Sequence, residues 1–320
     1  MHNGKLSGFG KHTIGLTSAV TASCLFGLST IFTKTGVSDV SVLTLISWRF
    51  IIAFTIMTIL ILVGVFQVDL RNKPVRGLLS IAIFSPAIYF LAEGKGLQLT
   101  TASEGGTILA MVPIVTLVLS ALLLKEYPTL RQTVSIIASV LGVVIIILSK
   151  SMSAQFSIAG YLFLFLAICS DSMCMVLTRK YLVYSPLERV YAMIAIGATL
   201  FTPMAIGEHL AAGTLTEYLL LPLHNSEFLI AVLYLGLVSS IVGFTLCAVG
   251  IRYIGPNKVT SLSGISTIIS IFAGTVFLQE SFTILQGFGT VLILLGAYNA
   301  NKKSEPIGKS NDNPVIIQSD

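Results

Sequence analysis

Residues 102–126 read ASEGGTILAMVPIVTLVLSALLLKE, and residues 256–280 read PNKVTSLSGISTIISIFAGTVFLQE. Both stretches are long and apolar, and each ends in a glutamate, Glu126 or Glu280. Each is long enough to cross a lipid bilayer, which takes about 20 apolar residues. The two stretches lie 154 positions apart, and the same offset relates two pairs of glycines, Gly96 with Gly250 and Gly142 with Gly296.

The composition of the whole chain agrees with a membrane protein. Of the 320 residues, 54% are hydrophobic and only 10% are charged, and the mean hydropathy is +0.91. Soluble domains carry about 25% charged residues, so most soluble enzyme classes, disordered chains and disulfide-stabilised secreted domains are excluded. The net charge of +5 does not indicate nucleic-acid binding, because its meaning depends on where the charges lie. The fold class predicted is an all-α membrane protein.

Ten membrane-spanning helices are predicted from the apolar runs. They cover 13–33, 42–66, 75–98, 102–124, 130–149, 158–178, 189–207, 228–251, 256–278 and 283–299. Most connections are short, and the longest is expected to be a loop over 208–227. We expect residues 1–12 to form a cytoplasmic N-terminus, 13–149 a first repeat, 158–300 a second repeat, and the polar residues 301–320 a disordered tail.

The positive charges predict the orientation of these helices. With the N-terminus inside, 15 of the 19 lysines and arginines fall in cytoplasmic segments. Only Lys34 and Lys150 fall in segments on the opposite side of the membrane, and Arg49 and Lys95 lie within the predicted spans. Cytoplasmic loops of membrane proteins carry such an excess. Both termini are therefore predicted to face the cytoplasm, in a multi-pass protein of the inner (cytoplasmic) membrane.

The repeat is predicted to be inverted. The offset of 154 makes helices 3–5 the equivalents of helices 8–10, and each half then holds five helices. An odd number of crossings reverses the direction of the second half in the membrane. Inverted repeats with a binding site near the bilayer midplane are typical of secondary transporters.

With these features the chain resembles the drug/metabolite transporter superfamily, and within it the EamA family. The resemblance rests on two five-helix halves and on a short set of motifs: Glu126 and Glu280 at the ends of helices 4 and 9, Trp48-Arg49-Phe50 in helix 2, Pro113 in helix 4, and Gly142 and Gly296 in helices 5 and 10. It implies a carrier, often an exporter, of amino acids or related metabolites. The chain has no Walker-type GxxxxGK[ST] motif for ATP.

Charged residues inside the predicted spans are the first candidates for a transport site, because such residues are costly in lipid and usually face protein or water. We single out Glu93, with Tyr89 one helical turn before it, as a substrate-binding or proton-carrying carboxylate. Arg49, beside Trp48, could hold a substrate carboxylate or form an ion pair with Glu93. Asp171 in helix 6 is a further candidate.

Small and hydroxyl residues at helical spacing predict the walls of a central cavity. One face of helix 3 carries Ser85, Tyr89, Glu93 and Gly96, and the offset of 154 places Ser239, Gly243, Cys247 and Gly250 on helix 8. Helix 9 contributes the candidates Ser263, Thr267 and Ser270. Close helix packing in membranes uses the same residue types, so both interpretations stay open. Pro113, Glu126 and Glu280 are assigned gating or structural roles, the glutamates because carboxylates stabilise helix N-termini.

Three functions compete at this point. The first is a secondary transporter of small polar metabolites, amino acids or their derivatives, with efflux favoured as the direction. The second is a carrier of hydrophobic or cationic compounds, and the third, disfavoured by the inverted repeat, is a membrane enzyme or scaffold. The partners expected are a small-molecule substrate and the lipid bilayer, with coupling protons and a second copy of the chain as open alternatives. No nucleic acid, metal ion or cofactor is expected.

Overall fold

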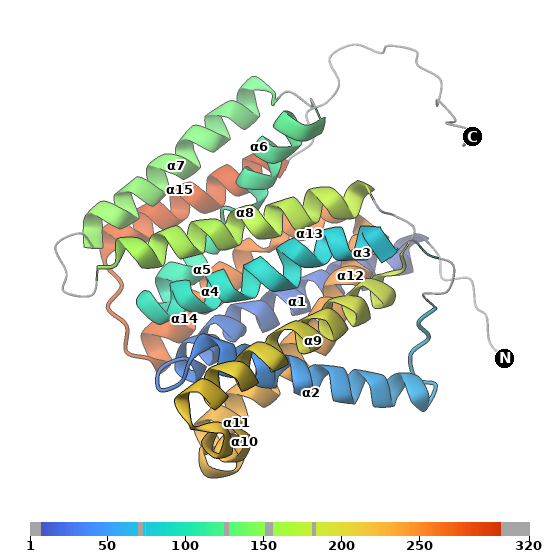
Figure 1. Ribbon diagram of the computed structural model, residues 1–320. Coiled ribbons are helices and arrows are strands. Elements are labelled where there is room, and N and C mark those ends of the chain that lie inside the picture. The colour runs from blue at the N-terminus through green and yellow to red at the C-terminus, as the bar shows by residue number, and fades with distance from the viewer. Residues whose placement is uncertain are drawn as a thin grey trace.

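The chain is all-helical over the residues that the computed structural model describes, which are 8–69, 73, 75–124, 128–150, 156–180 and 184–301. The first five crossings are α1 (Gly8–Gly36), α2 (Val42–Leu62), α3–η1–α4 (Val75–Ala82, Ile83–Ile88 and Tyr89–Leu99), α5–α6 (Ala102–Leu109 and Val112–Leu124) and α7 (Leu130–Lys150). The other five are α8 (Ile158–Lys180), α9 (Pro186–Ala212), α11–η2–α12 (Ser226–Leu233, Tyr234–Gly243 and Phe244–Ile254), α13–α14 (Pro256–Leu262 and Gly264–Phe277) and α15 (Ile284–Asn301). Figure 1 shows them as a bundle.

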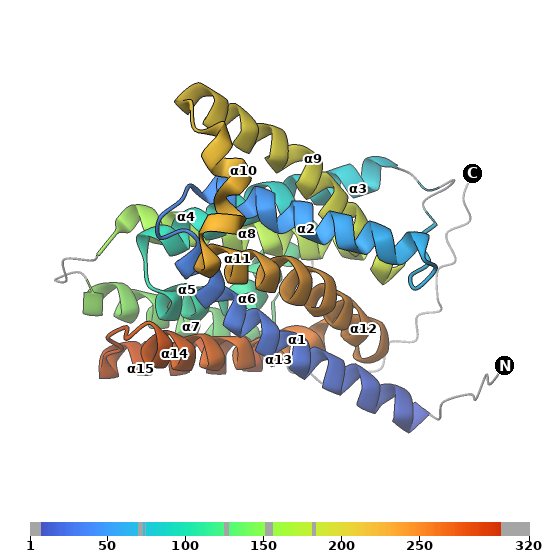
Figure 2. The same ribbon diagram turned by 90° about the horizontal axis from the view of Figure 1, so that it is seen from below.

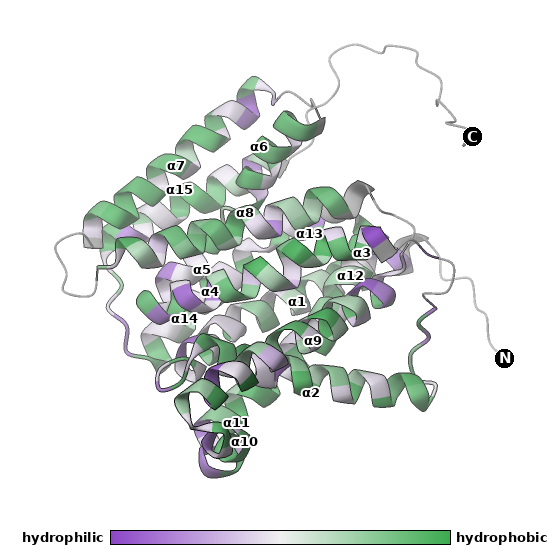
Figure 3. Ribbon diagram, viewed as in Figure 1, coloured by the Kyte–Doolittle hydropathy of each residue, from purple (hydrophilic) through white to green (hydrophobic). Residues whose placement is uncertain are grey.

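The predicted spans are confirmed in this part of the chain. Nine helices, counted through their internal breaks, are long and apolar enough to cross a membrane, and the tenth, α15, is a shorter apolar helix. Figure 3 shows hydrophobic residues along the helices, with hydrophilic residues mostly near their ends. On α7 the exposed side chains Val134, Ile137, Leu141, Val144 and Leu148 recur every three or four positions. This spacing forms one apolar face that suits contact with lipid.

The two halves break their helices at equivalent positions. The third crossing contains the π-helical stretch η1, and the offset of 154 maps it onto 237–242, inside η2 of the eighth crossing. The fourth crossing is interrupted at Ala110 and Met111, and the ninth at Ser263, the equivalent of Leu109. Stretches of π-helix are rare and are frequent at functional sites. The breaks therefore mark the middle of these four helices as places to search for a site.

Contacts between the halves follow the same relation. A Cβ atom on Gly15 of α1 would lie 2.8 Å from Ile254 at the end of α12, and a Cβ atom on Gly160 of α8 would lie 2.6 Å from Thr100 at the end of α4. Adding 145 to the number of Gly15 gives Gly160, and subtracting 154 from that of Ile254 gives Thr100, so the second contact is the symmetry equivalent of the first. Helix α1 thus corresponds to α8 with an offset of 145, and the pair α1–α12 corresponds to the pair α8–α4.

Helices α7 and α15 pack side by side across the same pseudo-symmetry, as Figures 1 and 2 show. A Cβ atom on Gly142 would lie 2.5 Å from the Gly289 carbonyl oxygen, and one on Gly296 would lie 2.7 Å from the Ser135 carbonyl oxygen. The two contacts are symmetry equivalents, because the offset of 154 relates Gly142 to Gly296 and Ser135 to Gly289. Only glycine permits so close an approach of two membrane helices, which explains Gly142 and Gly296 by packing.

The prediction of a loop over 208–227 is wrong. Helix α9 continues to Ala212, where Gly213 ends it in the left-handed conformation at φ 71°. A further short helix, α10 (Leu215–His224), follows directly, and Asn225 caps the next helix by accepting a hydrogen bond from Phe228 N–H. Glycine at such a C-terminal position is common, but the charged residues of this stretch resemble those of a loop. Helix α10 packs on α9 and α11.

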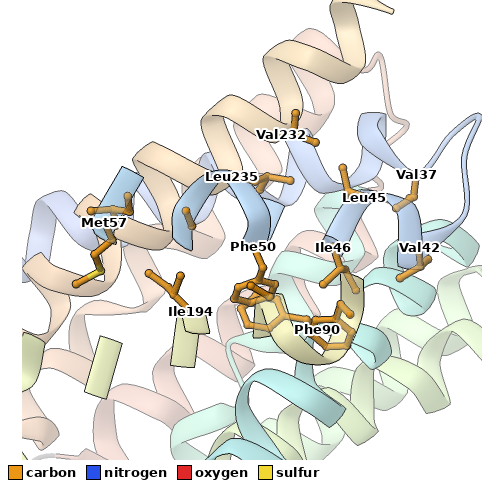
Figure 4. Packing of buried hydrophobic residues seen from close by; sticks show 14 of the residues in the cluster. Val37, Val42, Leu45, Ile46, Phe50, Met57, Phe90, Ile194, Val232 and Leu235 are labelled. Atoms are coloured by element: carbon orange, nitrogen blue, oxygen red, sulfur yellow. The ribbon is translucent and has the colours of Figure 1, made fainter. Parts of the chain in front are cut away.

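The largest core cluster surrounds Phe50 of α2. Its ring packs edge-on against Phe90 of α4, with centroids 5.0 Å apart, and stacks on Phe201 of α9 at 5.7 Å. Figure 4 shows Ile194, Ile46 and Leu235 near the rings of Phe50 and Phe90. Dense packing of this kind fixes the relative positions of α2, α4 and α9, which carry the candidate residues discussed below.

Candidate functional site

A cavity of about 290 Å³ lies among α1, α2, η1–α4, α5–α6, α8, α9, η2–α12 and α13–α14. Of the eight residues proposed from the sequence for substrate binding or coupling, five line it: Arg49, Tyr89, Glu93, Asp171 and Ser263. Small-molecule sites have volumes of roughly 300–1,000 Å³, so this cavity suits a metabolite of small size.

The two ends of the cavity differ. At the closed end, where α5 begins and α14 ends, these two helices pack along each other. At the open end, where α9 and α13 begin, the described residues of α6 and α13 show no comparable packing, although these helices are the equivalents of α14 and α5. The cavity wall extends to Pro186 and Val259, which lie near this open end. Arginines and lysines of the predicted cytoplasmic segments, among them Arg76 and Arg252, belong to the same end.

Arg49 is a buried cation held by hydroxyl groups and by a ring. Its Nε donates to Ser240 Oγ at 2.9 Å, and Nη2 lies 3.3 Å from Ser239 Oγ. Its guanidinium carbon lies 4.4 Å from the centroid of the Phe90 ring, a cation–π distance. The side chain is 4% exposed. These neutral partners position the guanidinium at the cavity wall without neutralising its charge.

Glu93 faces the same cavity and has a different partner. Its Oε1 accepts a hydrogen bond of 2.9 Å from the Tyr89 hydroxyl. The hypothesis of an ion pair between Arg49 and Glu93 is wrong for this structure, because the described residues contain a single ion pair, Lys73–Glu188 at 2.5 Å. The reason is that serines satisfy the guanidinium and a tyrosine satisfies the carboxylate. The two charges, with Asp171, therefore share one cavity and remain available to a ligand.

Trp48 lies on the other side of α2 from this cavity. Its Nε1 donates to the Tyr218 carbonyl oxygen at 3.2 Å, and its ring lies 5.7 Å from the Tyr218 ring. Ser47 extends the same contact, with its hydroxyl 3.0 Å from the Tyr218 hydroxyl. Burial raises the pKa of Tyr218. Trp48 thus fastens α10 to α2 and is absent from the residues that line the cavity.

Thr267 and Ser270 are placed in the closed end and away from the cavity lining. Thr267 Oγ1 donates to the Gly106 carbonyl oxygen at 3.0 Å, and Ser270 Oγ donates to the Ala102 carbonyl oxygen at 2.9 Å. Both side chains are fully buried. Their hydroxyls fasten α14 to α5. Ser263, at the break between α13 and α14, and Pro113, at the start of α6, do line the cavity.

Glu280 stabilises a helix N-terminus, but that helix is far away in the sequence. Its carboxylate accepts hydrogen bonds from the backbone N–H groups of Ala102 at 2.6 Å and Ser103 at 2.9 Å, in the first turn of α5. Just before this turn, Lys34 Nζ donates to the carbonyl oxygens of Leu97 and Thr100 at the end of α4. Opposite charges thus sit on the two helix ends that they favour. Glu126, the equivalent of Glu280, lies outside the described residues.

Further residues complete the cavity wall, and Arg189 among them was not singled out from the sequence. Arg189 lines the open end, because α9 begins at Pro186 under a capping box of Ser185 and Glu188; the box S-P-L-E is a readable signal. Cys247 and Ser239 of the eighth crossing (η2–α12) both line the cavity, as their helical spacing predicts. Cys174, Met175 and Met193 add soft apolar surface to the same wall.

The two halves contribute different chemistry at equivalent positions. Tyr89 corresponds to Gly243 by the offset of 154, and Phe26 corresponds to Asp171 by the offset of 145. A Cβ atom on Gly243 would lie 2.9 Å from the Phe26 ring. One side of the cavity therefore carries a phenol and two carboxylates, and the other carries the rings of Phe26 and Phe244, whose centroids are 5.1 Å apart.

Comparison with known proteins agrees with this architecture. The model of the EamA-like transporter family matches residues 13–148 and again 158–301. An uncharacterized transporter, YcxC of Bacillus subtilis, is 34% identical over 91% of this chain and 94% of its own length. A probable amino-acid metabolite efflux pump of Escherichia coli is 22% identical over 73% of this chain and 88% of its own length.

A solved crystal structure with 19% identity superposes with a TM-score of 0.59 and covers 92% of this chain and 98% of its own. At that identity the likeness concerns the fold alone. The two family matches cover nearly the whole chain and coincide with the two halves that enclose the cavity. This chain is a multi-pass membrane protein that belongs to the EamA-like transporter family.

Proposed function

We propose that the protein is a secondary carrier of a small zwitterionic metabolite, an amino acid or a derivative of one, and that it exports this substrate. The observation that carries the proposal is the presence of Arg49, Glu93 and Asp171 on one small cavity, with no ion pair between them. A zwitterion presents both a carboxylate and an ammonium group. A cavity with separate, hydrogen-bonded charges of both signs is complementary to it.

Each charged residue is assigned a role in this proposal. The fork of Arg49 binds the substrate carboxylate, because guanidinium groups match carboxylates with two parallel hydrogen bonds. Glu93 and Asp171 bind the ammonium group or exchange a proton with the cavity water. Intramembrane carboxylates commonly serve in proton relays. Relatives described as probable amino-acid metabolite efflux pumps support the substrate class, at 22% identity.

A second candidate function has a specific observation in its favour. The rings of Phe26, Phe90 and Phe244 and the side chains of Met175 and Met193 line the same cavity. With two carboxylates nearby, these groups would also suit a hydrophobic cation. The two substrate classes differ in one respect, because Arg49 can bind the carboxylate of a zwitterion but finds no such group on a hydrophobic cation.

Transport assays with reconstituted protein test the proposal. Liposomes containing the purified protein are loaded with unlabelled amino acids, and exchange of labelled amino acids is measured with and without a pH gradient. We expect exchange of at least one zwitterion and no change in Glu217→Gln, whose carboxylate is exposed outside the spans. Exchange of quaternary ammonium compounds but of no zwitterion would overturn the proposal in favour of the second candidate.

Proton coupling is tested with the same vesicles. If Glu93 or Asp171 carries the coupled proton, Glu93→Gln or Asp171→Asn abolishes accumulation driven by a pH gradient and retains exchange at equal pH. If the residue only binds the ammonium group, the apparent affinity falls in both assays. A folded Glu93→Gln protein with unchanged accumulation, affinity and pH dependence would remove Glu93 from the site.

A further inference from the structure

The guanidinium group of Arg49 has two edges, and each offers a planar anion two parallel N–H donors. The side edge consists of Nε and Nη2, and the end edge consists of Nη1 and Nη2. Serines occupy the side edge, because Nε donates to Ser240 Oγ at 2.9 Å and Nη2 lies 3.3 Å from Ser239 Oγ. Among the described residues Nη1 has no hydrogen-bond partner, and it is not fully enclosed, since the only enclosed side-chain polar atoms without partners there are threonine and serine hydroxyls. The end edge therefore remains open to the cavity.

Ser240 holds Arg49 from behind the cavity wall. Its side chain is fully buried and is absent from the cavity lining, to which Ser239 and Arg49 belong. The Ser240 hydroxyl donates to the Leu235 carbonyl oxygen at 2.8 Å, five positions earlier in the π-helical stretch η2. A hydroxyl has a single hydrogen, so this bond leaves the oxygen lone pairs to accept the Nε hydrogen. The backbone of η2 thereby sets the orientation of the guanidinium.

Two further contacts restrict how the guanidinium can turn. Gly236 lets η2 approach α2 closely, because a Cβ atom there would lie 3.0 Å from the Arg49 carbonyl oxygen and 3.2 Å from Ile52. The Phe90 ring lies 4.4 Å from the guanidinium carbon and covers one face of the group. The approach that still offers an anion two donors is therefore in the guanidinium plane, at the end edge.

The equivalent position in the other half carries no charge. Ser41 caps the N-terminus of α2 and Ser185 caps that of α9, which sets an offset of 144 for this pair of helices. The offset makes Met193 the equivalent of Arg49. Both side chains line the cavity, so the two halves present a thioether and a cation at the same place in its wall.

The serine partners of these two positions differ in the same way. The Ser85 hydroxyl lies 3.9 Å from Met193 Sδ, and the offset of 154 relates Ser85 to Ser239, which contacts the arginine. The next position does not match, because Ser240 corresponds to Pro86, which has no hydroxyl group. The half that carries the cation thus also carries the serine that binds its Nε, and the half that carries the methionine has neither.

We infer that Ser240 is a positioning residue for Arg49. With Ser239 it fills the side edge of the guanidinium, and it thereby reserves the end edge, Nη1 and Nη2, for the carboxylate of the substrate. The assignment of the end edge rests on the proposed function, since it needs a substrate with a carboxylate. The hydrogen bond from Arg49 to Ser240 does not depend on that function.

Hydrogen exchange of the arginine side chain tests the positioning without any substrate. The protein is labelled with ¹⁵N-arginine in detergent micelles, exchange of the Arg49 Nε hydrogen with water is followed by NMR, and Arg49→Lys identifies the signal by removing it. We expect slow exchange in the wild type, severalfold faster exchange in Ser240→Ala, and no change in Ser172→Ala. Ser172 is the matched control, because it is equally buried but its hydroxyl donates to the Val112 carbonyl oxygen. Equal exchange in Ser240→Ala and the wild type would overturn the positioning role.

Exchange assays in vesicles test the edge. They use the amino acid that the wild type exchanges and the amine that remains when its carboxylate is removed. Ser240→Ala should raise the half-saturating concentration of the amino acid severalfold and leave the maximal rate and competition by the amine unchanged. A substrate held at the side edge would give the opposite result, because loss of the serine would free Nε for it.

Higher or unchanged affinity of Ser240→Ala for the amino acid, or equal weakening for both ligands, would therefore overturn the assignment of the end edge. If the wild type exchanges no amino acid, the proposed function fails, whereas the NMR measurement still decides the role of Ser240. The two failures are thus distinguishable.

Discussion

Glu280 reaches the first turn of a helix that lies 177 positions earlier, where its carboxylate accepts a hydrogen bond of 2.9 Å from the Ser103 N–H group. Gly274 makes this reach possible, because a Cβ atom there would lie 2.5 Å from the Ser103 hydroxyl. The end of the second half thereby holds a helix of the first half. The closed end of the cavity depends on this contact between halves.

The substitution Glu280→Gln should destabilise the protein by about 1–2 kcal/mol, because it removes the charge from the N-terminus of α5 and weakens its cap. Thermal unfolding in detergent measures the effect. Glu217→Gln is the matched control, since Glu217 also lies in the first turn of a helix but is exposed. An unfolding midpoint lowered equally in both variants would show that Glu280 has no special role.

The substitution Gly142→Ala should cost about 1–3 kcal/mol, because its methyl group would lie 2.5 Å from the Gly289 carbonyl oxygen and force α7 from α15. Gly207→Ala is the control, since no atom lies within 4 Å of a Cβ atom at this helical position. Alanine there should be neutral or stabilising by up to about 1 kcal/mol. The unfolding midpoint of Gly142→Ala should therefore lie clearly below that of Gly207→Ala. Equal midpoints of the two variants would argue against close packing at Gly142.

The substitution Arg49→Lys should weaken binding of a zwitterionic substrate by about tenfold or more, because lysine lacks the planar fork. The affinity for an analogue without a carboxylate should change little. Competition in the exchange assay measures both values, with the exposed Arg252→Lys as control. A parallel loss for both ligands would instead assign Arg49 a structural role through Ser240 and Phe90.

Reporter fusions after Lys73, Arg131 and Lys258 should report the cytoplasm, and fusions after Val40 and Asn225 should report the outside, because lysine and arginine concentrate in the first group of segments. Alkaline phosphatase, which is active outside, and a fluorescent protein that folds inside measure the two locations. A cytoplasmic signal after Asn225 would contradict the predicted orientation, although the helices themselves would be unaffected.

The sequence was sufficient for the helices and for part of the cavity. Apolar length predicts each crossing, and the spacing of Ser85, Tyr89 and Glu93 predicts the wall that they form. Hydropathy could not separate cavity from packing for Thr267 and Ser270, because a buried hydroxyl serves either purpose. Their role is decided by the backbone carbonyl oxygens of α5, which accept their hydrogen bonds. No pattern within the sequence of α14 indicates these partners.

Arg49 and Glu93 illustrate the same limit for charges. The sequence places two opposite charges at similar depth, which favours an ion pair. Their actual partners, Ser240 and Tyr89, depend on how η2 and α4 turn around their axes. The π-helical stretch η2 changes that rotation locally, and no periodicity in the sequence predicted it. The loop predicted over 208–227 failed for a different reason, since the charged residues of a short surface helix resemble those of a loop.

Gly243 has a consequence for any gene in which the second half is replaced by a copy of the first. Such a chain would carry a tyrosine at the position of Gly243, where a Cβ atom would lie 2.9 Å from the Phe26 ring and that ring would have to move. The same exchange would place a second phenylalanine where Asp171 stands and a glutamate where Cys247 stands, so the two cavity carboxylates would lie at different positions. The two halves therefore carry different side chains at equivalent positions, and a pair of identical halves would enclose a cavity with different chemistry.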